Sequence, residues 1–200
     1  MKNLVRICVL LCAAVMANAV PVVITFDDLS ANINDGYGML YNEIPQNYQG
    51  LVWTPYNIVS GWNVNSGSTY KSVFKNTYDP VSLGNFASNS GAAIASVSGT
   101  TFNFDGAYFS TWADHDGFTS WSATSVTVEG YNGTTLVGSI TMNLSSNGYT
   151  WLNAGFKNIT KIDINGGNGK YWIMDNFTIP EPATIGILSL GALSLFRKKK

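Results

Sequence analysis

The feature that most constrains this chain of 200 residues is the absence of sustained helical periodicity between Val20 and Ile179. Gly, Asn, Ser and Thr interrupt this segment about every eight to twelve residues, which is the spacing of turns between short β-strands. The pattern predicts an all-β fold with about ten strands. The strand candidates are residues 22–26, 50–54, 58–64, 68–74, 92–97, 100–104, 107–111, 125–131, 135–144, 149–152, 159–164 and 171–179.

One hairpin is marked especially clearly. Val126 and Val128 alternate with polar residues, as a half-buried strand requires, and the stretch 159–164 alternates in the same way. Asn132-Gly133 separates two β-rich runs, and both residues accept positive φ. The sequence therefore predicts a hairpin over 125–144.

The overall architecture expected is a jelly-roll type β-sandwich. The Cys and Trp spacing of immunoglobulin-like sandwiches is missing, which favours the double-sheet jelly roll. The opening residues 24–29 and the closing residues 172–177 are similar to the first and last strands of galactose-binding-like and carbohydrate-binding jelly rolls. That resemblance implies the same fold for residues 20–179.

Residues 1–19 have the three parts of a secretory signal peptide. These parts are the cations Lys2 and Arg6, the apolar residues 7–15, and the cleavage site Ala17-Asn18-Ala19. Cleavage by signal peptidase would leave a mature chain that begins at Val20. Because Cys8 and Cys12 both lie in this peptide, the mature chain would have no disulfide, no Cys-ligated zinc and no cysteine nucleophile.

The C-terminal segment 180–200 has a second tripartite pattern. Pro180-Glu181-Pro182 precedes an apolar run over 183–196, and Arg197, Lys198, Lys199 and Lys200 end the chain. The prolines end any arriving strand, the run predicts a short hydrophobic helix, and the cations would stay on the cytoplasmic side of a membrane.

This tail resembles the PEP-CTERM sorting signal of Gram-negative and related bacteria. The resemblance implies recognition by an exosortase, a membrane transpeptidase, and delivery to the cell surface or to an exopolysaccharide matrix. It covers about the last twenty residues and implies nothing specific about the body of the protein. A simple tail anchor is the alternative interpretation.

The charge of the body argues against a nucleic-acid partner. Residues 20–179 contain eleven acidic residues against five lysines, so their net charge is −6. Nucleic-acid binding needs a basic stripe, which this segment does not supply.

Catalytic signatures are weak. His115 is the only histidine, and no Gly-x-Ser-x-Gly motif accompanies it. Glu43 and Glu129 are the only glutamates of the body, and Glu129 falls on the outward side of its strand. We therefore expect a non-enzymatic protein, with a glycan-active hydrolase or lyase that uses paired aspartates as the alternative.

Four oxygen-bearing side chains form a candidate structural calcium site. Asp27 and Asp28 follow the first strand, and Asp175 and Asn176 lie in the last one. Because the first and last strands of a jelly roll can be neighbours, these ligands could converge on calcium and tie the chain ends together. In the competing interpretation, Asp28 caps a loop and Asp175 accepts hydrogen bonds from backbone amides.

Tryptophans in polar surroundings suggest glycan binding, because an aromatic face stacks on a sugar ring while polar neighbours bind its hydroxyls. The candidate residues are Trp62, Trp112, Trp121, Asp114, His115 and Asp116, whereas Trp53, Trp151 and Trp172 are expected in the core. Burial of the first three tryptophans at a sandwich edge is an equal alternative. The function expected is an exported surface or matrix protein that binds a glycan, with a purely structural matrix protein as a further alternative.

Overall fold

The structure is a computed structural model, which describes residues 20–29, 33–34, 40–54, 58–61, 81–82, 85–89, 94–112, 119–167 and 169–180. These residues form β-strands and one short 3-10 helix, so the predicted all-β class is confirmed. Within these ranges, no helix has the length and apolar character needed to cross a membrane. The predicted leader 1–19, with Ala17 and Ala19, and the tail 181–200 lie outside the described residues.

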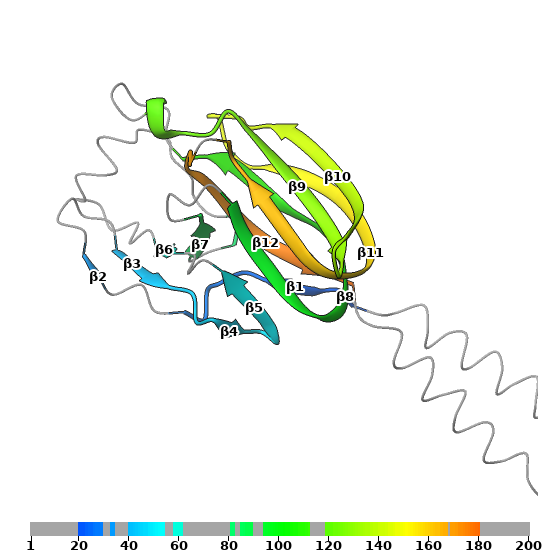
Figure 1. Ribbon diagram of the computed structural model, residues 1–200. Helices are drawn as coiled ribbons and strands as arrows, with labels where there is room; N and C mark the ends of the chain where they lie inside the picture. Colours follow the sequence, from blue (N-terminus) through cyan, green and yellow to red (C-terminus); the bar gives the residue numbers. More distant parts are fainter. Residues whose placement is uncertain are drawn as a thin grey trace, which may run out of the picture.

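Twelve strands and one helix make up the described part of the chain, and Figure 1 shows their arrangement. The strands are β1 (Val22–Ile24), β2 (Ile33–Asn34), β3 (Leu40–Glu43), β4 (Asn47–Tyr48), β5 (Leu51–Thr54), β6 (Ile58–Gly61), β7 (Asn85–Ser88), β8 (Ile94–Thr111), β9 (Ser125–Asn132), β10 (Thr135–Asn143), β11 (Thr150–Asn165) and β12 (Trp172–Ile179). The 3-10 helix η1 covers Thr119–Trp121.

All twelve strands belong to one open antiparallel sheet. Its main order is β10-β9-β11-β8-β12-β7-β6-β3-β2, with β1 paired to β12, and β5 paired to both β4 and β8. The two longest strands, β8 and β11, pair with each other, and β8 changes its other partner along its length. The first part of β8 pairs with β5, and its last part pairs with β12. Figure 1 shows both strands as long, curved ribbons in the middle of the sheet.

These long strands correct the sequence prediction, which divided them at glycines and polar residues. Three predicted strands, 92–97, 100–104 and 107–111, are one strand of 18 residues, and β11 likewise joins 149–152 to 159–164. Gly106 does not break β8, because it serves a close approach: a Cβ there would lie 2.0 Å from the carbonyl oxygen of Leu152. Register shifts near Phe156 bend β11 without ending it.

The predicted hairpin is confirmed. β9 and β10 pair in antiparallel register from Thr135 opposite Asn132 to Asn143 opposite Ser125. Only Gly133 of the expected pair takes positive φ, at 58°, while Asn132 remains the last residue of β9. The alternation is also confirmed, since Val126, Val128, Ile162 and Ile164 are all fully buried.

An aromatic stack forms the centre of the hydrophobic core. Trp53 of β5 contacts Phe26 edge-on at 5.5 Å between ring centroids and Phe177 of β12 at 5.4 Å. Phe177 in turn stacks on Phe104 of β8 at 4.5 Å, and Phe104 lies 6.4 Å from Phe156 of β11. The four strands that bear these rings are thereby packed around one buried cluster.

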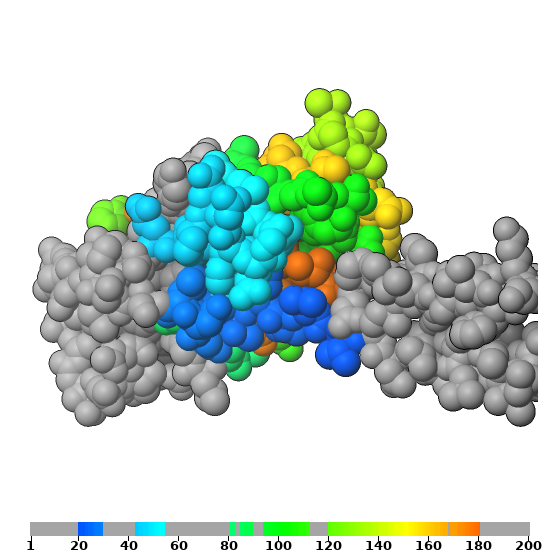
Figure 2. All heavy atoms as spheres, turned by 90° about the horizontal axis from the view of Figure 1, so that it is seen from below, coloured from blue at the N-terminus to red at the C-terminus, as the bar shows by residue number. Residues whose placement is uncertain are grey.

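The two ends of the described body lie side by side. β1 pairs with β12 so that Val22 faces Ile179 and Ile24 faces Phe177. In Figure 2, the blue and cyan N-terminal residues lie across this face, and only a small orange part of β12 is visible beside the green β8. The expectation that the first and last strands are neighbours is therefore correct.

Candidate functional site

The structure describes two of the six candidate glycan-binding residues. Trp112 follows β8 and is half-buried, and Trp121 ends η1 with 56% of its surface exposed. Trp62, Asp114, His115 and Asp116 lie outside the described residues, as do the sorting residues Glu181, Pro182, Arg197, Lys198, Lys199 and Lys200. Pro180, directly after β12, is half-buried.

Tyr171, which sequence reasoning missed, contacts the ring of Trp112 and the backbone of Trp121. Tyr171, directly before β12, packs on Trp112 with 5.4 Å between ring centroids. Trp112 also contacts Phe86 of β7 edge-on at 6.5 Å. The backbone N–H of Tyr171 donates to the carbonyl oxygen of Trp121 at 2.7 Å. We call these four residues, Phe86, Trp112, Trp121 and Tyr171, the Tyr171 cluster.

Strand alternation explains why these side chains gather. Trp172 points into the core with no exposed surface, so Tyr171 before it points to the opposite face of the sheet. Tyr108, Ser110 and Trp112 share that face, because residues two apart on a strand point the same way. Because the first four residues of β12 are all buried, no apolar/polar alternation in the sequence marks Tyr171.

Backbone hydrogen bonds fix η1 beside the start of β12. Ser122 and Tyr171 form an isolated parallel bridge, and Ala123 N–H donates to the Tyr171 carbonyl at 2.8 Å. Lys170 Nζ donates to the carbonyl oxygen of Ser120. The Lys170 carbonyl accepts a bond of 2.7 Å from the side-chain amide of buried Asn89. Several hydrogen bonds therefore hold the backbone that carries the exposed Trp121 ring.

One prediction about the tryptophans is wrong. Trp53 and Trp172 are fully buried, as expected, but Trp151 is 37% exposed. Leu152 is the residue of this pair that enters the core, so Trp151 faces outward and packs edge-on against Tyr108 at 5.1 Å. The side chain of Trp151 also lies over Gly106, where a Cβ would come within 2.8 Å of its Cζ2 atom.

The candidate calcium residues separate into two groups. Asp27 and Asp175 converge on Ser82, whose hydroxyl lies 3.3 Å from Asp27 Oδ1 and 3.0 Å from both carboxylate oxygens of Asp175. We call Asp27, Ser82 and Asp175 the Ser82 junction. Asp28 instead accepts hydrogen bonds from the Tyr48 hydroxyl and, at 3.3 Å, from Gln49 Nε2.

Asp175 is fully buried, and backbone amides compensate much of that burial. The N–H of Ser82 donates to Oδ2 and the N–H of Asn176 donates to Oδ1, both at 2.7 Å. The pKa of Asp175 is raised above its ordinary value, mainly because of burial. These amides and the Ser82 hydroxyl lower it in part, and the nearby charge of Asp27 raises it. Asn176 adopts φ of 52°, and the register of β12 shifts between Asp175 and Thr178, so a local irregularity aims this amide at the carboxylate.

A second carboxylate at the junction is also held by the backbone. Asp27 Oδ1 accepts a 2.8 Å bond from the N–H of Asn85. The side-chain amide of Asn85 donates to the carbonyls of Phe26 at 2.9 Å and Leu29 at 2.8 Å. Ser82 and Asn85 thus join the loop after β1 to β7 and, through Asp175, to β12.

These contacts fit hydrogen bonding better than a calcium shell. Ser82 lies between the two carboxylates that converge, and Asp28 is directed to other partners. The described residues contain no group of three or more His, Cys, Asp or Glu side chains suited to a metal ion. Asn176 Oδ1 is buried without a hydrogen-bond partner in this part of the chain, but it is a single oxygen. The calcium hypothesis stays a prediction.

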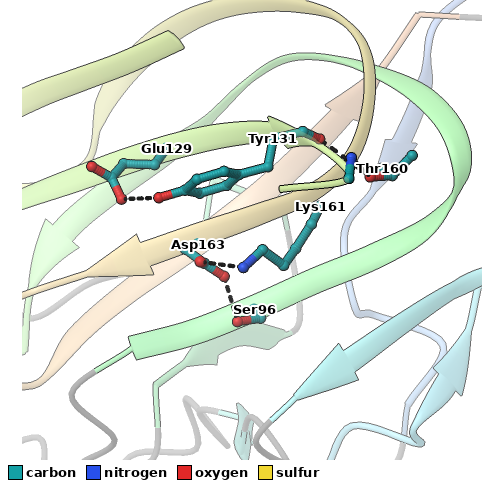
Figure 3. Close-up of polar contacts among 7 residues, drawn as sticks. Ser96, Glu129, Tyr131, Thr160, Lys161 and Asp163 are labelled. Carbon is teal, nitrogen blue, oxygen red and sulfur yellow. Dashed lines mark hydrogen bonds and ion pairs between the residues drawn. The ribbon is translucent and has the colours of Figure 1, made fainter. Parts of the chain in front are cut away.

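A polar network on the outer face of β9, β11 and β8 brings two carboxylates together (Figure 3). Glu129 and Asp163 are cross-strand partners. Glu129 accepts a 2.7 Å bond from the Tyr131 hydroxyl, which raises the pKa of Tyr131. Asp163 accepts from Lys161 at 2.7 Å and from Ser96 at 2.6 Å.

The rest of this network ties its members to the same strands. Lys161 Nζ lies 4.6 Å from the centre of the Tyr131 ring, so one cation contacts both an acid and an aromatic face. Thr160 Oγ1 accepts from the N–H of Gly133 at 2.9 Å and donates to the Tyr131 carbonyl at 3.4 Å. The carboxylates of Glu129 and Asp163 each accept a hydrogen bond from a neighbouring side chain on this face. We therefore interpret these contacts as a network that fixes the register of the strands.

Comparison with known proteins adds no family assignment. The sequence matches no protein-family model, and a search of curated proteins found no relative.

Proposed function

We propose that this chain is an exported, non-enzymatic protein of the cell surface or extracellular matrix that binds glycans through the Tyr171 cluster. In this proposal signal peptidase removes residues 1–19, and an exosortase recognises the tail that begins at Pro180. The domain that is delivered is the body 20–179, with a jelly-roll type sandwich as its architecture. The partner changes along β8 support two layers, since β5 joins its first part and β12 its last part.

The observation that carries the glycan assignment is the exposure of Trp121 beside a packed aromatic pair. Trp121 has 56% of its surface in water, and its flat aromatic face suits a sugar ring. Trp112 and Tyr171 hold their mutual position through ring packing at 5.4 Å. A preorganised aromatic surface of this kind loses little conformational entropy on binding.

The test is glycan binding by the wild-type protein and by Trp121→Ala, on a glycan array and on purified exopolysaccharide of the producing cells. Because Tyr171 bonds the carbonyl of Trp121, the substitution keeps the backbone anchor. We expect Trp121→Ala to weaken binding at least about tenfold, as for an exposed aromatic anchor. Trp151→Ala is the matched control, since Trp151 is also exposed but is not a member of the Tyr171 cluster.

The other outcomes separate the competing functions. Equal loss of binding in both variants would refute the assignment to the Tyr171 cluster. Release of oligosaccharide from the polysaccharide would establish a hydrolase or lyase. A wild-type protein that binds no glycan on either surface would refute the proposal and favour a structural matrix protein.

A further inference from the structure

The strand β10 forms one edge of the sheet, and a register shift near its start is the one edge-protecting feature that its described residues carry. Among the strands that the structure describes, β10 pairs with β9 alone. Its nine residues, Thr-Leu-Val-Gly-Ser-Ile-Thr-Met-Asn, contain no charged residue and no proline. Natural proteins commonly place lysine or proline on such edges, because free N–H and C=O groups invite pairing with another strand.

Apolar side chains accompany this open backbone. Leu136 is 50% and Val137 47% exposed, and both lie at the start of β10. Ile140 and Met142 are only partly buried and pack against the edge of the main core. A strand added beside the second part of β10 would cover Ile140 and Met142 as well as bond the backbone. The edge therefore offers apolar contact in addition to hydrogen bonds.

We propose that β10 pairs with β10 of a second copy of this chain, in antiparallel orientation about a two-fold axis. The partner is a second copy because the apolar and polar positions of β10 match those of its own copy when the two strands run antiparallel. With the axis at Thr141, Ile140 faces Met142 on the core side, and Ser139 faces Asn143 on the outer side. Since opposed residues keep the same face, apolar side chains meet apolar ones and polar side chains meet polar ones.

The absence of charge also favours a self-partner. In an antiparallel self-pair the residue at the axis meets its own copy, so a charge there would be opposed by a like charge. β10 avoids that penalty along its whole length. The β9 hydroxyl of Thr127 lies 2.8 Å from that of Thr141, so the residue at the proposed axis is already held in place. The register shift between Leu136 and Gly138 limits regular pairing to the second part of the strand.

Sedimentation velocity of the whole protein over a wide concentration range tests the dimer. We expect a monomer–dimer equilibrium, which is weak because a single edge contact is small. Thr141→Lys should raise the dissociation constant at least about tenfold, because it sets two ammonium groups opposite each other. Asn153→Lys on β11 is the control, since it adds the same charge at an exposed position away from β10.

Cross-linking tests the register directly. In a chain with Cys8→Ser and Cys12→Ser, Thr141→Cys supplies a single thiol that would lie opposite its copy, within reach of a disulfide. We expect a cross-linked dimer on mild oxidation from Thr141→Cys and none from Asn153→Cys. A monomer at all concentrations, a dimer unaffected by Thr141→Lys, or equal cross-linking from both cysteine positions would overturn the proposal.

Discussion

The aromatic ring of Phe156 lies over two glycines of the β9–β10 hairpin, and mutations can test how closely it packs there. Gly130 and Gly138 face each other across β9 and β10, and the Phe156 side chain of β11 covers both. A Cβ at Gly138 would lie 2.7 Å from Cε1 of the ring and 3.1 Å from Cδ1. A Cβ at Gly130 would lie 2.6 Å from Cδ2, on the other edge of the ring.

We expect Gly138→Ala to destabilise the protein because of this contact. Carbon atoms pack at about 3.5 to 4.0 Å, so the new methyl group would force the ring to move. Phe156 is only 6% exposed and stacks near Phe104, so it has little room. Overpacking of a core costs about 1 to 3 kcal/mol. Without the ring, alanine would stabilise by about 0.4 to 1 kcal/mol, because Gly138 has no positive φ and alanine restricts the unfolded chain.

A double-mutant cycle with Phe156→Leu isolates the contact. Leucine has no Cε and no Cζ atom, so the 2.7 Å approach disappears. We expect Gly138→Ala to lower the free energy of unfolding by about 2 kcal/mol in the wild type and to be neutral or stabilising beside Phe156→Leu. Urea unfolding followed by tryptophan fluorescence measures this as a midpoint shift of about 1 M. An equal cost in both backgrounds would show that the ring is not the cause.

Ser82→Ala should lower the free energy of unfolding by about 2 kcal/mol, because the Ser82 hydroxyl donates to a fully buried carboxylate. The control Ser146→Ala, at an exposed position, should change it by less than about 0.5 kcal/mol. Equal melting temperatures of the two variants would contradict this prediction. Chelation with EDTA should leave the melting temperature unchanged, because backbone N–H groups already donate to the two carboxylates that converge, and a drop of several degrees would establish the calcium site instead. N-terminal sequencing of protein recovered from the cell surface should give Val20, and an intact Met1 would refute export through the predicted leader. Deletion of residues 180–200 should release the protein into the medium, and unchanged retention would argue against a sorting role for the tail.

The strands that sequence reasoning located best are those in which alternation and turn chemistry agree. The 125–144 hairpin has both signals, and its bounds are confirmed within a residue or two. The predicted division of β8 at glycine was wrong, because the same residue type marks a turn and a close contact inside a strand. Gly106 is needed under Trp151 and beside Leu152, a requirement that arises only when β11 pairs with β8.

Sequence reasoning selected candidate-site residues by their local neighbours and missed those whose contacts are remote in the sequence. Trp112 and Trp121 were selected by their polar neighbours, but their common partner Tyr171 lies about fifty residues later in the sequence. Ser82 is separated from Asp175 by 93 residues, and nothing in its surroundings marks it as the donor between two acids. Trp151 and Leu152 are adjacent large apolar residues, and only the tertiary fold decides which one enters the core.

The direction of β12 relates the proposed binding site to the proposed anchor. Tyr171 lies directly before the first residue of this strand, and Ile179, its last residue, pairs with Val22 at the chain's opening strand. Eight residues at about 3.3 Å each separate the two ends by about 26 Å. The tail leaves the body at the second end, since Pro180 follows Ile179 directly. If the tail holds the protein at the membrane as we propose, the Tyr171 cluster lies at the end of β12 away from that anchor, where a glycan of the surrounding matrix could reach it.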